Sequence, residues 1–312
     1  IYTQDVLTAA LLTLVEAENS TLLWLLPLLT DENFRRRITS KVKDRMALRP
    51  FWEQFEALRD TEKRQQISPV LNKLRQLTLR PGLRNVLGQA KPKFMLTDLF
   101  YKRRIVLIPL NKGLTGGESA RLLGSLIVGL TWTLALSRAG IPAEKRHIVE
   151  IYIDELQDYL SLPTDLADAL AQARGLGVGL TLAHQYRDQL PLNIRSGIDA
   201  NARNKIVFGL NSRDAKDMAA MASELTAEDF MSLPRYQIYT SFQSGGRNTG
   251  WMQGRTLPPP PALHDAAELK AKSQAAYGIP SEQVEEDYLK IFSGGYDEPE
   301  QNNTTIGRRK RP

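Results

Sequence analysis

The run Ile148-Val-Glu-Ile-Tyr-Ile-Asp154-Glu155 is an apolar segment that ends in two consecutive carboxylates. A short apolar run of this kind predicts a buried strand, here over His147 to Ile153. In open α/β sheets the carboxyl ends of the strands face the ligand crevice. The two acids are therefore expected at a binding site. The competing interpretation is a strand that stops at an exposed acidic turn.

Strand and helix signals alternate on both sides of this run. We expect further strands at 105–110, 177–183 and 205–209, and two more at 236–242 and 249–256 around the turn 243–247. Helices are expected at 119–138, 165–174 and 214–222. This alternation predicts an α/β fold, in which a mostly parallel sheet carries helices on both faces.

The expected helix 119–138 has an apolar middle, Leu122 to Leu136, that is bracketed by Arg121 and Arg138. A membrane span needs about 20 apolar residues, and this middle is shorter. We therefore expect a buried core helix.

Composition narrows the functional classes. The 312 residues are 42% hydrophobic and 24% charged, which is typical of a globular protein of about two domains. Cysteine is absent, which excludes disulfides, thiolate metal sites and a cysteine nucleophile. Only three histidines occur, far apart in the sequence, so a histidine-rich metal site is not expected. The chain begins with Ile1 and shows no signal peptide. We interpret it as a piece of a longer protein.

The positive charge is concentrated in one segment. Residues 33–104 contain 19 Lys/Arg and 6 Asp/Glu, a balance of +13, whereas the remainder carries −7. Residues 1–101 show helical apolar spacing, so we expect a basic helical lobe there, an α/β core over 102–258 and a partly disordered tail over 259–312. The charge points to nucleic acid as partner, although a solvated helical face would look the same. The candidate DNA contacts are Arg35, Arg36, Arg37, Lys41 and Lys43.

The acids and their neighbours fit nucleotide hydrolysis. Asp154 is suited to a magnesium shell and Glu155 to general-base activation of water. Gln185 follows the next expected strand, where it could sense a γ-phosphate. Arg174 ends the helix between them, and a favourable helix cap is the alternative role for it. Gly175 is expected to allow the sharp turn that frees Arg174.

Three runs then carry a resemblance to a family: IYIDELQDYL, ALAQARGLGVGLTLAHQYRDQLP and ARNKIVFGLNSRDAKDMA. Together they resemble the C-terminal half of HerA/FtsK-type P-loop motor ATPases, closest to the TraG/TraD-like coupling proteins of conjugative type IV secretion. The run 103–130 resembles the strand, loop and helix before Walker B, and the basic lobe resembles an inserted helical lobe. The resemblance implies a RecA-like core, with Asp154 as magnesium carboxylate, Glu155 as catalytic base, Gln185 as sensor and Arg174 as a finger into a neighbouring subunit.

The chain departs from this family in one respect, because no G-x-x-x-x-G-K-[ST] phosphate loop occurs in it. The glycine-rich segment Gly113 to Ser119 has a glutamate where the lysine should be, and we interpret it as a turn. We expect that the phosphate loop lies before residue 1 and that this chain alone is inactive. The alternative is a protein that has lost hydrolysis.

The resemblance implies a DNA-translocating ATPase that uses ATP and Mg²⁺ and assembles as a homo-oligomer, by resemblance a hexameric ring. Its partners would be DNA and a relaxase or secretion-channel proteins. It would lie in the cytoplasm at the inner membrane, with membrane contact only through segments outside this chain. The alternatives are a HerA-like helicase or DNA-packaging motor, and a non-hydrolysing module that binds DNA or a relaxase.

Overall fold

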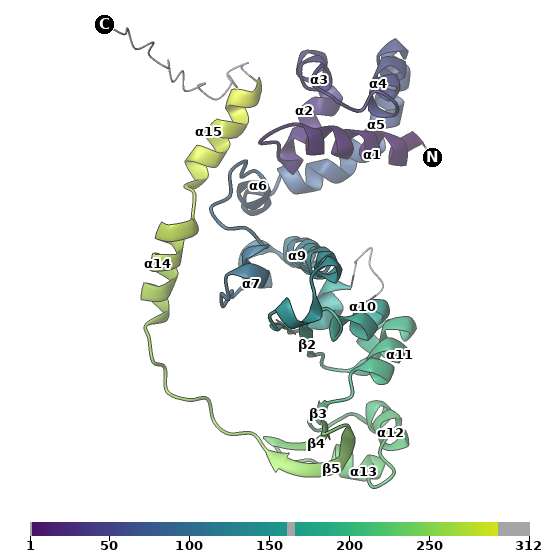
Figure 1. Ribbon diagram of the computed structural model, residues 1–312, viewed down its shortest axis with the longest axis vertical. Coiled ribbons are helices and arrows are strands. Elements are labelled where there is room, and N and C mark those ends of the chain that lie inside the picture. Colours follow the sequence, from purple (N-terminus) through teal and green to yellow (C-terminus); the bar gives the residue numbers. More distant parts are fainter. Residues whose placement is uncertain (1, 161–165, 293–312) are drawn as a thin grey trace, which may run out of the picture. The chain divides into compact units, whose positions relative to one another are not determined.

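The structure is a computed structural model that describes residues 2–160 and 166–292 (Figure 1). The chain divides into two compact units, residues 1–93 with 269–312 and residues 94–268. The sequence analysis placed the borders after 101 and after 258 instead. The tail does not form a separate unit, because its residues from 269 onward belong to the first unit. Residues 293–312 of the tail, which the sequence predicts to be partly disordered, lie outside the described residues.

The first unit is helical throughout its described residues. Its helices are α1 (Tyr2–Glu16), α2 (Leu25–Thr30), α3 (Glu32–Thr39), α4 (Leu48–Ala57), α5 (Asp60–Thr78), α6 (Pro81–Leu87) and α15 (Ser281–Phe292), with most of α14 (Ala266–Tyr277). The expectation of helices in this part of the chain is confirmed.

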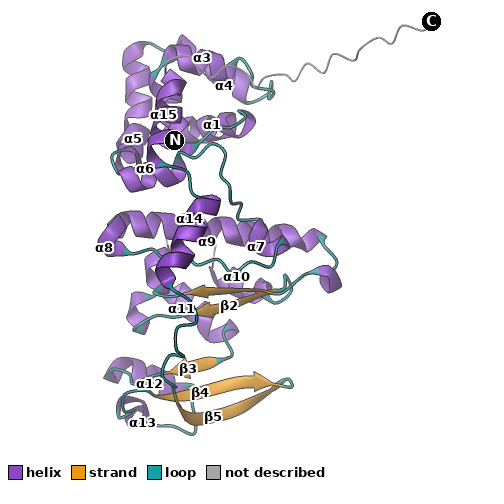
Figure 2. Cartoon of the chain, turned by 90° about the vertical axis from the view of Figure 1, so that its left-hand side faces the viewer, coloured by secondary structure: helices purple, strands orange, loops and turns teal. Residues whose placement is uncertain are grey.

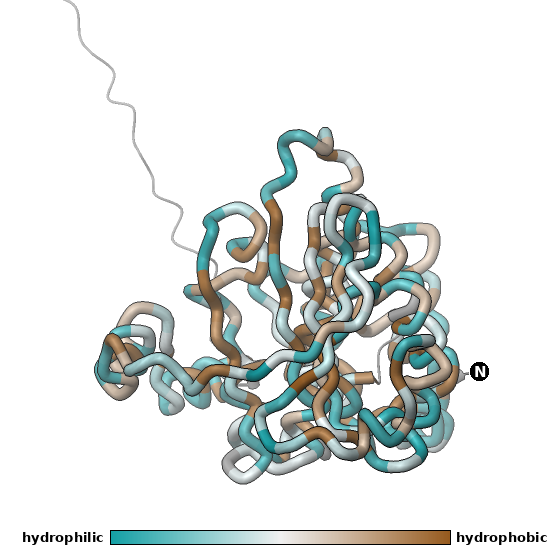
Figure 3. The backbone as a smooth tube through the Cα atoms, turned by 90° about the horizontal axis from the view of Figure 1, so that it is seen from below, coloured by the Kyte–Doolittle hydropathy of each residue, from teal (hydrophilic) through white to brown (hydrophobic). Residues whose placement is uncertain are grey.

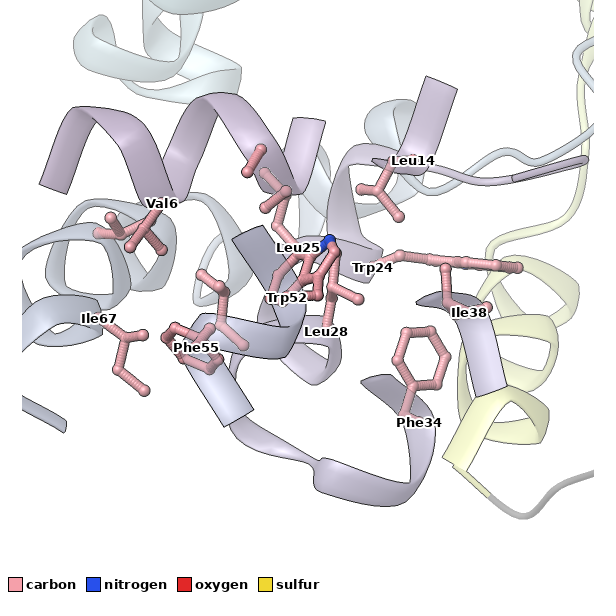
Figure 4. Packing of buried hydrophobic residues seen from close by; sticks show 14 of the residues in the cluster. Val6, Leu14, Trp24, Leu25, Leu28, Phe34, Ile38, Trp52, Phe55 and Ile67 are labelled. Carbon is pink, nitrogen blue, oxygen red and sulfur yellow. The ribbon is translucent and has the colours of Figure 1, made fainter. Parts of the chain in front are cut away.

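The core of this unit is built from apolar residues at helical spacing (Figure 4). Leu25 and Leu28 of α2 are almost completely buried, and the run of leucines that the sequence shows here forms the centre of the cluster. Trp24 packs edge-on against Phe34. The indole N–H of Trp52 donates to the hydroxyl of Thr13 at 2.8 Å, so that this buried polar pair is satisfied.

Helix α15 packs on this helical lobe, although some 190 residues separate it from α6. Val284 and Ile291 are buried, and a Cβ on Gly88 would meet a Val284 methyl at 3.1 Å. The guanidinium of Arg37 donates to the carbonyl of Ile291 at 2.9 Å. Arg84 pairs with Glu285 at 3.0 Å. The lobe thus includes a segment that the sequence placed in the tail.

The second unit contains all the strands among the described residues. They are β1 (Val149–Ile153), β2 (Val178–Leu182), β3 (Lys205–Val207), β4 (Gln237–Ser244) and β5 (Arg247–Arg255). The helices are α7 (Asp98–Tyr101), α8 (Lys112–Thr115), α9 (Gly117–Ser137), α10 (Leu166–Ala173), α11 (Leu192–Asn201), α12 (Ser212–Ala220) and α13 (Ala227–Met231). Asp165, the expected start of α10, lies outside the described residues.

Strands β1 and β2 pair in parallel, with Val149 opposite Val178 and Ile153 opposite Leu182. Buried side chains from α9, α10 and α11 pack around this pair, among them Trp132, Ala169 and Ile194. Parallel pairing across an intervening helix is the arrangement that strand–helix alternation predicts. The expectation is confirmed for this part of the chain.

The second sheet is antiparallel, in the order β3-β4-β5 (Figure 2). The hairpin between β4 and β5 turns through Gly245 and Gly246, both with positive φ, which glycine adopts without strain. This hairpin was expected from the sequence. The strand expected at 205–209 is shorter and pairs antiparallel with β4. The buried ring of Phe230 of α13 contacts Tyr239 and Trp251 of this sheet edge-on.

One expected strand is wrong. The run 105–110 belongs to neither sheet, and its Ile105 and Leu107 are 92% and 86% exposed. It lines a cavity of about 1550 Å³ together with β1. The apolar composition that predicted a buried strand is real, but no described strand supplies the ladder hydrogen bonds that would pair it.

Hydrophobic and hydrophilic residues alternate along the chain (Figure 3). Among the described residues one helical segment, Gly117–Gly140, is long and apolar enough to cross a membrane by length and composition alone, and 44% of its apolar window is buried inside the structure. Its residues Leu123, Trp132 and Ala135 are buried. Gly124 lies so close to the ring of Tyr159 that a Cβ there would be 2.2 Å from Cδ1. One side of α9 packs in the core, whereas more than half of its apolar window is not buried, so the sequence expectation of a buried helix holds only in part.

Candidate functional site

The parallel pairing of β1 and β2 brings their carboxyl ends together. The ladder continues beyond both strands, since the N–H of Ala183 donates to the carbonyl of Ile153 and the N–H of Leu156 donates to that of Ala183, each at 2.9 Å. Glu155 and Gln185 therefore emerge at the same edge of the sheet. This is the edge at which open α/β sheets bind ligands.

Glu155 lies between two amides. The side-chain nitrogen of Gln185 donates to its Oε1 at 2.7 Å, and that of Gln157 donates to its Oε2. The hydrogen bond from Gln157, then that from Gln185, lowers the pKa of Glu155 below its ordinary value, and the positive charge of Lys112 adds to the effect. Glu155 is therefore ionised at neutral pH, which is the form that can accept a proton.

The backbone of Glu155 is strained. Its φ of 52° and ψ of 50° lie in the left-handed region, which non-glycine residues rarely adopt. Such conformations persist where the surrounding structure over-determines them, and they concentrate at functional sites. Leu156, directly after it, is buried. The sequence carried no signal for this strain.

Asp154 is exposed, and its Oδ1 accepts a hydrogen bond from the N–H of Glu155 at 3.0 Å. No group of three or more potential ligand side chains that could hold a metal ion occurs among the described residues. Magnesium at nucleotide sites is bound through one or two carboxylates, with phosphates and waters filling the other positions. One exposed carboxylate beside Glu155 fits that donor set.

Sequence reasoning missed three residues at this edge. The ammonium of Lys112 contacts Oδ2 of Asp158, and Nε of Arg121 lies 3.5 Å from Oδ1. These three residues line a polar cavity of about 520 Å³ with Glu155 and Gln185. The segment expected to be a turn is instead α8 and the start of α9. The missed signal was the position of Lys112 just after an apolar run, at the edge where Asp154 and Gln185 were expected.

The loop that carries Gln185 is anchored by Arg187. Its guanidinium makes a two-pronged contact with Asp199 of α11, at 2.9 and 2.6 Å, and lies 3.4 Å from Asp217 of α12. Burial, then the charge of Arg187, lowers the pKa of His184, which is therefore neutral at neutral pH. The contacts of Arg187 with Asp199 and Asp217 tie the Gln185 loop to α11 and α12.

Arg174 lies away from this site. It follows α10, at the amino end of β2, and its exposed side chain makes no hydrogen bond or ion pair with a described residue. Gln185 follows the other end of β2, and four steps of about 3.3 Å make the strand alone about 13 Å long. The left-handed turn in this loop falls on Gly177, with a φ of 69°, and not on Gly175 as expected.

The basic candidates lie in the other unit and are not equivalent. Arg35 is a correction to the sequence expectation, because it is only 4% exposed, with its Nε 2.5 Å from Glu56 and its guanidinium over the Phe55 ring. A buried, paired arginine stabilises the lobe and cannot reach DNA. Arg36, Lys41 and Lys43 are exposed.

No protein-family model and no curated protein sequence matches this chain. Several solved structures match this chain. The plasmid coupling protein TrwB with the ATP analogue ADPNP matches with a TM-score of 0.56 and 17% identity, over 84% of this chain and 66% of TrwB. The unbound conjugative coupling protein TrwBdeltaN70 matches with a TM-score of 0.55 and 17% identity, over 85% and 66%. TrwB with ADP and Mg²⁺ matches with a TM-score of 0.51 and 17% identity, over 84% and 65%.

This chain therefore spans about two thirds of the length of the TrwB chains that it matches. At this identity the likeness concerns the fold. The parallel β1–β2 pair, the helices around it and the helical lobe form the mixed α/β arrangement expected from the sequence. The chain has the RecA-like fold of the TrwB-type conjugative coupling proteins.

Proposed function

We propose that this protein is an ATPase of the conjugative coupling type, which moves DNA at the expense of ATP. The observation that carries the proposal is the contact between Gln185 and Glu155, a glutamine and a glutamate at the carboxyl ends of two neighbouring parallel strands. The TrwB structures with an ATP analogue and with ADP and Mg²⁺ support nucleotide as the ligand.

Glu155 is the general base in this proposal. A carboxylate has about four lone-pair positions, so Glu155 can accept from water while the two amides hold its oxygens. Gln185 orients the same water towards the terminal phosphate, as a glutamine does in other nucleotide hydrolases. Transfer of a proton to a positioned base contributes about two to four decades in rate.

Asp154 would hold the magnesium shell, and bound magnesium would supply positive charge against the β- and γ-phosphates. Replacement of Asp154 by asparagine removes a charge from that shell and should weaken magnesium-dependent nucleotide binding.

The phosphate loop is proposed to come from residues outside these 312. Without the loop's lysine and backbone donors, the phosphates have no preorganised cradle. The 312 residues alone should therefore hydrolyse ATP far more slowly than the complete protein. Arg174 would complete the site from a neighbouring subunit of a ring.

Exposed cations of the lobe are proposed to hold the DNA backbone. Neutralising phosphates releases counterions, so the logarithm of affinity should fall with the logarithm of salt by about 0.9 per phosphate contacted. Replacing Lys41 and Lys43 with alanine should lower that slope, whereas Lys216→Ala, at an exposed position of α12, serves as the control. A flat salt response would remove this part of the proposal.

DNA-stimulated phosphate release and ATP-dependent displacement of a triplex strand together test the whole function. The complete protein should show both, on duplexes of unrelated sequence, because backbone contacts carry no sequence information. Hydrolysis that ignores DNA, with no displacement, would contradict the translocase proposal and favour a non-motor role. Relaxase or channel partners and a place at the cytoplasmic face of the inner membrane are further parts of the proposal.

A further inference from the structure

One buried carboxylate at the candidate site, that of Asp158, is in contact with two cationic side chains. Asp158 is 9% exposed, whereas the side chains of Lys112 and Arg121, which contact its two oxygens, are 48% and 60% exposed. A buried carboxylate needs one compensating charge. Lys112 and Arg121 together carry one more positive charge than Asp158 can neutralise.

The surrounding geometry fixes where Asp158 lies. Its N–H donates to the carbonyl of Glu155 at 2.9 Å, within the single turn that follows β1. The next residue, Tyr159, packs directly on Gly124 of α9. Asp158 is therefore held at a fixed position relative to Glu155, and it can hold a flexible lysine in turn.

The ammonium of Lys112 faces the cavity and not bulk solvent alone. Lys112, Glu155 and Asp158 line both the polar cavity of about 520 Å³ and the larger apolar one beside it. An ammonium has three N–H donors, and Lys112 forms an ion pair with Asp158 on one side only. The remaining donors lie beside the carboxylate that we propose as the general base, where the phosphoryl group that reacts with water must also lie.

We propose that Lys112 is a phosphate-binding residue that contacts the terminal phosphate of a bound nucleoside triphosphate, with Asp158 as its positioning residue. The proposal rests on the proposed function and extends it. A cation at the transferred phosphoryl group stabilises charge that grows in the transition state. Lys112 would thus act from the strand and loop before β1, separately from the lysine of a phosphate loop.

The test compares ATP with ADP, because only ATP has the terminal phosphate. Lys112→Met in the complete protein should weaken binding of a fluorescent ATP analogue about 10- to 100-fold, and binding of the ADP analogue by less than about 3-fold by the same argument. Lys112→Arg should restore part of the difference. Asp158→Asn should lower affinity for ATP more than for ADP as well. Lys145→Met, at the opposite end of β1, is the matched control.

Equal losses for ATP and ADP, or no loss, would overturn the proposal. A second measurement needs no variant: the ATP analogue, but not ADP, should protect Lys112 from an amine-reactive reagent, and Lys145 should label equally in both. Labelling of Lys112 that ignores the terminal phosphate would also overturn it. If the parent protein hydrolyses ATP normally while these tests fail, Lys112 alone is misassigned. If the parent binds no nucleotide, the proposed function falls as well.

Discussion

Removal of Arg174 should stop hydrolysis even though the residue is remote from its own subunit's site. The five-residue strand β2 lies between Arg174 and Gln185, a separation of at least about 13 Å along the strand. The arginine therefore cannot touch a phosphate held at Glu155 of the same subunit. If it takes part in catalysis, it acts on a neighbour. An arginine supplied in trans is worth about three to five decades in rate.

The alternative role for Arg174 is a helix cap, whose loss would cost stability of about 1 kcal/mol or less and leave catalysis intact. Steady-state phosphate release by the complete protein separates the two roles. Arg203→Ala, another exposed arginine beyond a helix end, is the control. Rings that mix Arg174→Ala and Glu155→Gln subunits should regain part of the activity, because some interfaces then pair an intact glutamate with an intact arginine. Normal hydrolysis by the Arg174→Ala ring alone would refute the reasoning.

Two further predictions concern stability and can be checked by thermal and acid denaturation. Gly124→Ala should destabilise the protein by about 1–3 kcal/mol, because the added methyl would overlap Tyr159, whereas Gly117→Ala in the same helix has open space and should not destabilise it. Arg35→Ala should cost about 1–3 kcal/mol, since Glu56 is 27% exposed and keeps Lys63 as a partner, and Arg36→Ala should cost nearly nothing. Burial raises the pKa of Glu56, but the hydrogen bonds from Arg35 and Lys63 outweigh the effect of burial, so the pKa of Glu56 is lowered overall. The stability that ionised Glu56 contributes is present above its unfolded pKa and lost as the pH falls through the folded one, so Arg35→Ala should lose the part of it that Arg35 provides.

The candidate site was predictable where chemistry follows strand ends. Asp154, Glu155 and Gln185 follow apolar runs, and parallel pairing brings such ends to one edge. Lys112 and Asp158 were not found, since neither belongs to a recognised spacing and their meeting depends on how α9 packs against the turn after β1. The left-handed backbone of Glu155 likewise has no counterpart in residue type.

In the fold, too, the sequence predicts some features and not others. Helices and the β4–β5 hairpin follow from apolar periodicity and turn glycines, which are local signals. Whether 105–110 pairs as a strand, and in which direction β3 pairs, depends on partner strands, which periodicity does not specify. Arg35 was predicted together with its exposed neighbours, because charge alone does not reveal burial. It is buried because its guanidinium lies over the Phe55 ring and pairs with the Glu56 carboxylate, which are about 20 residues further along the chain.

The central claim is that Glu155 is the base of a nucleotide-hydrolysing site, and the most direct measurement is single-turnover ATP hydrolysis by Glu155→Gln in the complete protein. The amide keeps the shape of the side chain but cannot take a proton from water, so the rate should fall by about two to four decades. ATP affinity should stay close to that of the parent, and Glu150→Gln, an exposed glutamate on the same strand, should hydrolyse normally. Hydrolysis by Glu155→Gln at the parental rate would contradict the account.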